Sequence, residues 1–223
     1  MLQQEVFRVD DPRWMRDLAR DHPWATLISH TAHRGLVVSH LPVLVDDSPQ
    51  DARDTGDAGS TGHTGGTVPA LLGHLARTDA EDHELGSHEV VVVLQGPHGY
   101  ISPTWYEETP HVPTWNFTVL HVHGRPEILD PADTYDVLSA TVDHFEDRFP
   151  EPWRLARVAA HAHRLAPAVT GFRLPATKVT AKAKLSQDER EEVVLRLARA
   201  LESGQPYASP ELARAMRDTR RKP

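Results

Sequence analysis

Apolar residues recur along this chain with a period of two in several segments, which is typical of β-strands. Residues 24–31 and 35–45 are rich in Val, Leu, Ile and Thr and lie only three residues apart, which predicts an antiparallel hairpin. Strand character returns at 69–75 and at 88–95, where the EVVVVL run is apolar on both faces, as in a central strand. Residues 115–123 alternate more clearly, so the pattern predicts several strands in one core.

Helical signals occur before and after these strands. Asp11 is an N-cap candidate for a first helix that should end near residue 22. Asp130 opens a second helical region, and inserted helices are predicted at about 131–165. The apolar stripe expected to cover the sheet consists of Tyr135, Leu138, Val142, Phe145 and Phe149.

The C-terminal part combines one more strand with a helical tail. Residues 169–179 return to strand character after the break at Pro167. Ser186 to Glu189 has the form of a capping box that opens a helix, and Ser209-Pro210 starts a last short helix. The predicted fold is mainly β with α, with a β domain at residues 1–185 and a C-terminal helical tail at 186–223.

Between the first strands and the rest lies a stretch without apolar periodicity. Residues 46–67 consist largely of Asp, Gly, Ser and Thr, a composition that does not support a packed core. We interpret the stretch as a low-complexity loop at the tip of a hairpin, and a lid over a site is the less favoured alternative.

Composition narrows the class of protein. With 39% hydrophobic and 25% charged residues, the chain has the composition of a soluble globular protein. The sequence contains no apolar run of the roughly 20 residues that a membrane span needs, and its first residues lack the features of a secretory signal. We therefore predict a cytoplasmic protein without membrane contact. A net charge of -8 argues against a generally cationic nucleic-acid binder and leaves only a local basic patch as a route to DNA.

Metal chemistry has little support in the sequence. The chain has no Cys, so a metal site would need His, Asp or Glu ligands. His121 and His123 share one face of a predicted strand, but no acidic third ligand accompanies them. We interpret them as a half-buried polar stripe and predict no metal site. Lys178, Lys182 and Lys184 suit either an anionic ligand or, as the favoured interpretation, a solvated strand edge.

The segment with the most chemical potential is residues 95–116, QGPHGYISPTWYEETPHVPTWN. Its glycines permit close backbone approach and its aromatic residues supply flat walls, which suits a planar ligand as well as it suits a rigid structural loop. The shorter SHLP at 39–42 and GHLAR at 73–77 place His and Arg side chains near strand ends.

In this order SHLP, GHLAR, QGPHGYISPTWY, VPTWN and KAKLSQ resemble the signature blocks of the PaiB-type FMN-binding family of negative transcriptional regulators. The resemblance extends from Phe7 to about Leu201. It implies a split β-barrel of the FMN-binding type with peripheral helices, FMN as cofactor, and a homodimer with the flavin at the subunit interface. By the same resemblance, the residues expected to contact the cofactor are Ser39, His40, Leu41, Gly73, His74, Arg77, Trp115, Asn116, Lys184 and Gln187, with Arg77 at the phosphate.

The chain departs from the family pattern at three places. Residues 46–67 form a long insertion, Ala183 stands where the last block usually has Trp, and Asp188 stands where it usually has Asn. Losing an aromatic wall and adding a carboxylate near a phosphate both disfavour flavin binding.

The family implies a repressor of transcription, yet the residues support DNA binding only through the basic end at 214–222, which a solvated terminus explains as well. The alternative is a flavin-dependent oxidoreductase with an unidentified small-molecule substrate, in which His40 or His74 would act near the flavin ring. A haem-binding relative with an axial His is a third, less favoured interpretation. The sequence alone does not decide whether the protein is an enzyme.

Overall fold

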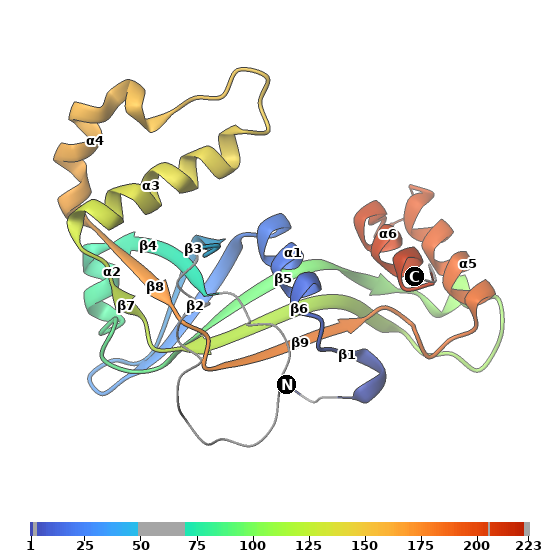
Figure 1. Cartoon of the computed structure of the whole chain (residues 1–223). Helices are drawn as coiled ribbons and strands as arrows, with labels where there is room; N and C mark the ends of the chain where they lie inside the picture. The colour runs from blue at the N-terminus through green and yellow to red at the C-terminus, as the bar shows by residue number, and fades with distance from the viewer. Residues whose placement is uncertain (2–3, 49–69, 205, 221–223) are drawn as a thin grey trace. The chain divides into compact units, whose positions relative to one another are not determined.

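The computed structural model describes residues 1, 4–48, 70–204 and 206–220, and its strands pair in antiparallel fashion (Figure 1). The strands are β1 (Arg8–Val9), β2 (Trp24–Thr31), β3 (Gly35–Val45), β4 (Leu71–Ala76), β5 (Val90–Ile101), β6 (Thr114–Gly124), β7 (Glu127–Ile128), β8 (Val169–Leu174) and β9 (Lys178–Lys184). The α-helices are α1 (Pro12–Asp21), α2 (Arg77–Asp82), α3 (Pro131–Glu146), α4 (Ala159–Leu165), α5 (Glu191–Glu202) and α6 (Pro210–Asp218). Short 3-10 helices lie at Glu5–Phe7, Pro103–Tyr106, Leu155–Val158 and Ala166–Ala168. A mainly β fold with added helices is confirmed.

The helix starts predicted from the sequence are explained by their caps. The Asp11 carboxylate accepts a hydrogen bond from the backbone N–H of Arg13 at 2.9 Å, and Asp130 accepts two such bonds at the start of α3. Pro12 and Pro131 occupy the first helical positions, where a missing N–H costs nothing. None of the described helices is both long enough and apolar enough to cross a membrane.

The chain divides into two units, each with its own core. Unit 1 comprises residues 1–10, 95–120 and 180–223, and unit 2 comprises 11–94 and 121–179. Unit 2 contains the strand order β5-β2-β3-β4-β8-β7, and unit 1 contains the order β1-β9-β6-β5, so that β5, β6 and β9 contribute residues to both. The predicted boundary at residue 185 stays a prediction, and most of the predicted loop at 46–67 lies outside the described residues.

In unit 1, α5 and α6 pack on each other through fully buried side chains. These side chains are Val193, Val194, Leu197, Leu201, Leu212 and Met216. The predicted capping box at the start of α5 is wrong, because α5 begins at Glu191 with Arg190 as its N-cap residue. Ser186 instead adopts a left-handed conformation with φ 62° in the turn after β9. The last helix starts after Ser209 as predicted.

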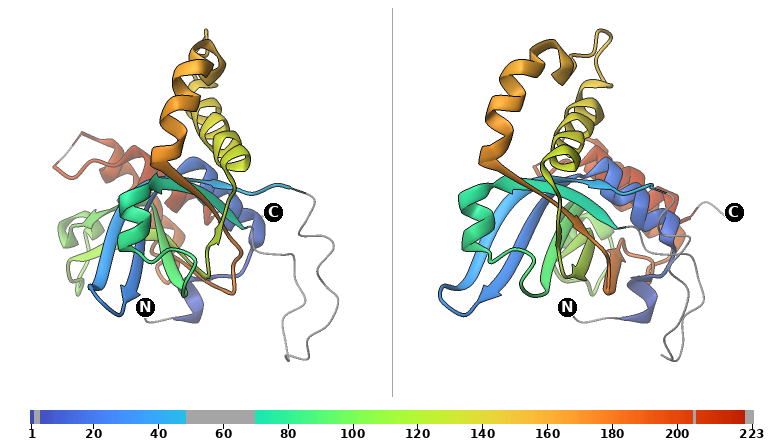
Figure 2. Two further views of the ribbon diagram at one scale, coloured as in Figure 1. Left: turned by 90° about the vertical axis from the view of Figure 1, so that its left-hand side faces the viewer. Right: turned by 60° about the vertical axis from the view of Figure 1, so that its left-hand side comes forward.

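In unit 2, α3 and α4 lie side by side on the same side of β4 and β8 (Figures 1 and 2). The residues that α3 buries are Thr134, Val137 and Thr141. The predicted apolar stripe is therefore wrong for this helix, since Phe145 and Phe149 remain exposed and Tyr135 stacks on His163 of α4. The hydroxyl of Thr141 is satisfied by the carbonyl of Val137 at 2.8 Å, which allows a polar residue in the buried stripe.

Two segments predicted as single elements differ in the structure. Residues 169–179 do not form one strand, because β8 ends at Leu174 and β9 begins at Lys178. The Gly- and Pro-containing segment that starts at Gln95 was expected to lie between strands, yet β5 continues through it to Ile101. Its glycines therefore lie in a strand, where Gly99 faces the Cδ2 atom of Leu212.

Candidate functional site

The predicted cofactor contacts fall into both units and are described unit by unit. Unit 2 holds Ser39, His40, Leu41, Gly73, His74 and Arg77. Unit 1 holds Trp115, Asn116, Lys184 and Gln187.

One face of the β2–β3 hairpin in unit 2 carries apolar side chains that stay exposed. Trp24, Leu36 and Val38 have exposed fractions of 63%, 73% and 54%. The cross-strand register places Trp24 opposite Pro42, Thr26 opposite His40, Ile28 opposite Val38 and His30 opposite Leu36. We call Trp24, Thr26, Ile28, Leu36, Val38 and His40 the open face. The views of Figures 1 and 2 show this hairpin extending beyond α3 and α4.

The strand alternation separates the three predicted residues of the SHLP block. His40 belongs to the open face, where its Nδ1 lies 3.1 Å from the hydroxyl oxygen of Thr26. Ser39 and Leu41 belong to the opposite face, and Leu41 is buried in the core. One ligand on the open face can therefore meet the side chain of His40 but not those of its two neighbours.

Ser39 is engaged by a histidine that sequence reasoning missed. His83 is fully buried, with its Nε2 at 3.0 Å from the Ser39 hydroxyl and its Nδ1 at 2.7 Å from the Ser29 hydroxyl. Burial lowers the pKa of His83, which keeps the ring neutral at physiological pH. His83 lies in the acidic sequence AEDHEL, where nothing distinguishes it from a surface residue.

The GHLAR block also divides into different environments. Gly73 faces the core, where an added Cβ would lie 2.6 Å from the ring of Phe172. His74 pairs in register with Gly171, which lies against Thr134 of α3, so the side chain of His74 lies on the α3 side of the sheet. The Nδ1 atom of His74 is buried without a hydrogen-bond partner among the described residues, and burial lowers its pKa.

Arg77 begins α2 and points toward the segment that follows α4. Its Nε and one terminal nitrogen donate to the carbonyl oxygen of Pro167, at 2.8 and 2.5 Å. Because a guanidinium has five N–H groups, three remain available to a ligand in the described part of the chain. Its expected role at a phosphate stays a prediction.

In unit 1, an aromatic cluster surrounds Trp115. The Trp115 ring has an exposed fraction of 53% and lies 6.3 Å from the ring of His98 and 6.4 Å from that of Tyr100. Tyr207 extends the cluster, with its ring 5.0 Å from Tyr100. Rings at these distances form a continuous flat surface, the feature expected of a wall for a planar ligand.

Asn116 and Gln187 are used inside unit 1. The Asn116 amide is fully buried and donates to the Ser186 hydroxyl at 2.9 Å, while its Oδ1 has no partner among the described residues. The Gln187 side chain accepts from the backbone N–H of Leu185 at 2.7 Å and donates to the carbonyl of Ala183. Both residues therefore hold the turn that follows β9.

The lysines of β9 do not form a solvated edge as expected. Lys182 has an exposed fraction of only 7%, and its ammonium group lies 5.7 Å from the ring centres of Phe7 and Phe117. Lys184 donates to the Thr114 hydroxyl, and burial lowers its pKa. Both Lys182 and Lys184 belong to the interior of unit 1 rather than to its solvated surface.

The basic C-terminal end contributes to the fold of unit 1. Arg220 donates to the backbone carbonyls of Ser186, Gln187 and Glu189 at 3.0, 3.2 and 2.7 Å. Arg217 bonds to Glu202 of α5 at 2.6 Å. The interpretation of this segment as a solvated terminus is therefore wrong for Arg217 and Arg220.

Arg220→Ala is expected to destabilise the protein by about 2 kcal/mol, because three charge-assisted hydrogen bonds are lost and the carbonyls of a buried turn lose their donor. Urea denaturation followed by tryptophan fluorescence measures this change. Arg214→Ala, at an exposed position of the same helix, is the matched control and should change stability by less than about 0.5 kcal/mol. Equal effects of the two substitutions would contradict the structural role of Arg220.

The chain matches, over residues 1–178, the model of a family described as "Putative FMN-binding domain". It belongs to this FMN-binding family. "Protease synthase and sporulation protein PAI 2" of Bacillus subtilis is 27% identical over 155 residues, which cover 68% of this chain and 74% of that protein. The predicted PaiB-type resemblance is thus confirmed, and the family match confirms FMN as the expected cofactor.

Solved structures of low sequence identity share the fold of the FMN-binding family member described above. The FAD and heme binding protein from Mycobacterium smegmatis aligns with a TM-score of 0.56 and 14% identity, over 90% of this chain and 81% of that chain. The flavocytochrome Anf3 from Azotobacter vinelandii aligns with a TM-score of 0.55 and 12% identity, over 86% and 77%. The predicted split-barrel fold is confirmed.

The donor set of this FMN-binding family member fits a flavin within unit 2. The open face combines apolar walls with one polar pair, Thr26 and His40, as small-molecule sites usually do. The unpartnered buried Nδ1 of His74 and the three remaining N–H groups of Arg77 offer further polar atoms. Among the described residues no group of three His, Asp or Glu side chains could hold a metal ion. His121 and His123 are both half-buried, as predicted for a polar stripe.

Proposed function

We propose that the protein is an FMN-binding homodimer of the PaiB type that acts as a negative transcriptional regulator, with the flavin against the open face. The observation that carries this proposal is the apolar open face with His40 at its centre. Soluble monomers rarely leave contiguous large apolar side chains exposed without a function. A flavin ring and a second subunit together would cover Trp24, Leu36 and Val38.

In this proposal the polar pair of the open face orients the cofactor. FMN supplies reversible electron transfer when it is bound. Thr26 and His40 supply hydrogen bonds within an otherwise apolar wall, so they fix the orientation of a ring that the apolar side chains hold by contact. Trp24, Ile28 and Val38 exclude water from that wall.

The regulatory role is supported by the likeness to PAI 2. A specific observation favours the second candidate, a flavin-dependent oxidoreductase: Arg217 and Arg220 are engaged inside unit 1, which removes two of the cations that DNA contact would need. Salt-sensitive, sequence-selective DNA binding by the FMN-loaded protein would support the regulator. Oxidation of NADH or NADPH without DNA binding would support the oxidoreductase.

His40→Ala is expected to weaken FMN binding about tenfold, because it removes a hydrogen-bonding group from the wall that contacts the flavin. Flavin fluorescence quenching during titration of the protein with FMN measures the affinity. Ser39→Ala is the matched control, since the neighbouring side chain points to the opposite face and its loss should leave the affinity within about twofold. A tenfold loss in Ser39→Ala with no change in His40→Ala would place the flavin elsewhere.

A further inference from the structure

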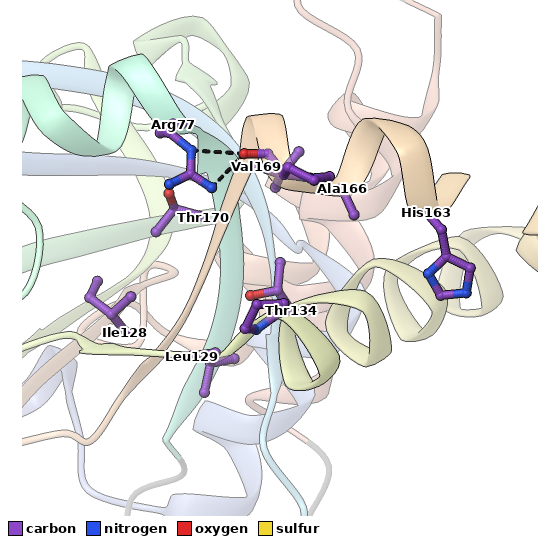
Figure 3. A pocket seen from close by; sticks show the side chains of 10 residues that line it. Arg77, Ile128, Leu129, Thr134, His163, Ala166, Val169 and Thr170 are labelled. Atoms are coloured by element: carbon purple, nitrogen blue, oxygen red, sulfur yellow. Dashed lines mark hydrogen bonds between the residues drawn. The ribbon is translucent and has the colours of Figure 1, made fainter. Parts of the chain in front are cut away.

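A second pocket in unit 2 lies between the start of α3 and the segment that joins α4 to β8 (Figure 3). Its volume is about 350 Å³, within the range of small-molecule sites. Arg77 and Thr170 lie together at one end and His163 lies at the other, with Ile128 and Leu129 along one side. We propose that this pocket binds a small organic carboxylate with an apolar body.

Arg77 supplies the anion-binding group, and its orientation is fixed. The carbonyl oxygen of Pro167 accepts from two of its nitrogens, so the guanidinium plane does not need to be ordered when a ligand binds. The three remaining N–H groups can pair with the two oxygens of a carboxylate. Thr170, in register with Leu75 at the start of β8, lines the same end of the pocket and adds a hydroxyl.

The charge of the pocket selects for a single negative charge. Among its described lining residues none is acidic, and Arg77 is the one Arg or Lys. A carboxylate would be neutralised by this cation, whereas a phosphate dianion would remain half compensated. A neighbouring pocket of about 460 Å³ shows the contrast, since its described lining includes four aspartates, Asp21, Asp47, Asp143 and Asp147.

The other lining residues suit an apolar ligand body. Ile128, Leu129, Ala166 and Val169 line the pocket with aliphatic surface. The His163 ring is held in place by stacking on Tyr135, with ring centres 4.0 Å apart and planes inclined by 15°. A branched or aromatic acid of modest size therefore matches both the cation at one end and the apolar walls.

Isothermal titration of the full chain with benzoate tests the site, with benzyl alcohol as the uncharged probe. We expect benzoate to bind with a Kd of about 0.1–1 mM, as befits a ligand of nine heavy atoms, and benzyl alcohol to bind at least tenfold more weakly. Arg77→Gln should weaken benzoate binding at least about tenfold. Ala166→Phe, which fills the pocket and keeps Arg77, should abolish it. Arg34→Gln, an exposed arginine paired with Asp82 at 2.7 Å, should leave it unchanged.

The titration is repeated with saturating FMN and with inorganic phosphate, because the carboxylate site does not depend on the proposed flavin function. Unchanged benzoate affinity in FMN supports a separate site, even if FMN itself fails to bind. Displacement of benzoate by FMN would overturn the proposal, since the pocket would then belong to the flavin. Displacement by phosphate at equal affinity, or binding that survives in both Arg77→Gln and Ala166→Phe, would overturn it as well.

Discussion

The Trp24→Glu protein is expected to be monomeric and to bind FMN at least about 100-fold more weakly than the unaltered protein. Trp24 is the largest side chain of the open face and has an exposed fraction of 63%. In the proposed dimer its ring would be buried, and burying a carboxylate there instead costs several kcal/mol. Because the same face holds the flavin, dimer dissociation and cofactor loss should occur together. Sedimentation velocity and FMN titration on the same preparation measure the two effects.

Phe149→Glu is the matched control for this experiment. Phe149 is also an exposed aromatic residue of unit 2, with an exposed fraction of 59%, but it follows α3 and lies outside the open face. Phe149→Glu should leave both the dimer and the FMN affinity unchanged. A dimer that persists in Trp24→Glu and dissociates in Phe149→Glu would move the subunit interface to the α3–α4 region.

Strand positions were predictable because a period of two is visible in short apolar runs. Both strands of the hairpin were predicted within the bounds that the structure shows, from Trp24 to Thr31 and from Gly35 to Val45. The same period also determines which side chains of SHLP can share a ligand. A conserved-looking block such as SHLP suggests three neighbouring contacts, yet only alternate residues of a strand face the same side.

The helix faces were less predictable because apolar character does not decide burial alone. In α3 the sequence favours the stripe that contains Phe145, whereas the structure buries the stripe of Thr134, Val137 and Thr141. Thr134 fits closely against Gly171, where a Cβ would lie 2.6 Å from its hydroxyl oxygen. Such a close contact depends on a residue 37 positions away, which the periodicity of one helix cannot reveal.

The polar contacts of the interior could not be predicted for a similar reason. Lys182 lies between Phe7 and Phe117, and Arg220 bonds to the turn at residues 186–189, but these partners come from distant parts of the sequence. A lysine on a strand and an arginine near a terminus are usually solvated, so composition favoured the wrong interpretation in both cases.

The Asp46→Asn protein is expected to be less stable than the unaltered protein by about 3 kcal/mol at pH 7. Asp46 is buried at the end of β3 region and accepts a hydrogen bond from the Nε of Arg173 at 2.6 Å and from the backbone N–H of Ser48 at 3.0 Å. Substituting one partner of a buried ion pair leaves the other charge poorly compensated. Arg173 keeps its weaker contact with Glu127 at 3.4 Å, which places the expected loss at the lower end of the usual range.

The same pair predicts how stability depends on pH. Burial alone would raise the pKa of Asp46, but the hydrogen bonds from Arg173 and Ser48 outweigh it and lower the pKa below its ordinary value of 3.8. A carboxyl group with a lowered pKa stabilises the folded state above its ordinary pKa, and this stabilisation is lost as the pH falls through the folded-state value. Urea denaturation at pH 7 and at pH 3 should therefore show a smaller difference between the two proteins at pH 3. Asp47→Asn, which removes an exposed partner of Arg20, is the control and should cost less than about 1 kcal/mol at either pH. A difference for Asp46→Asn that grows as the pH falls would contradict the ion pair.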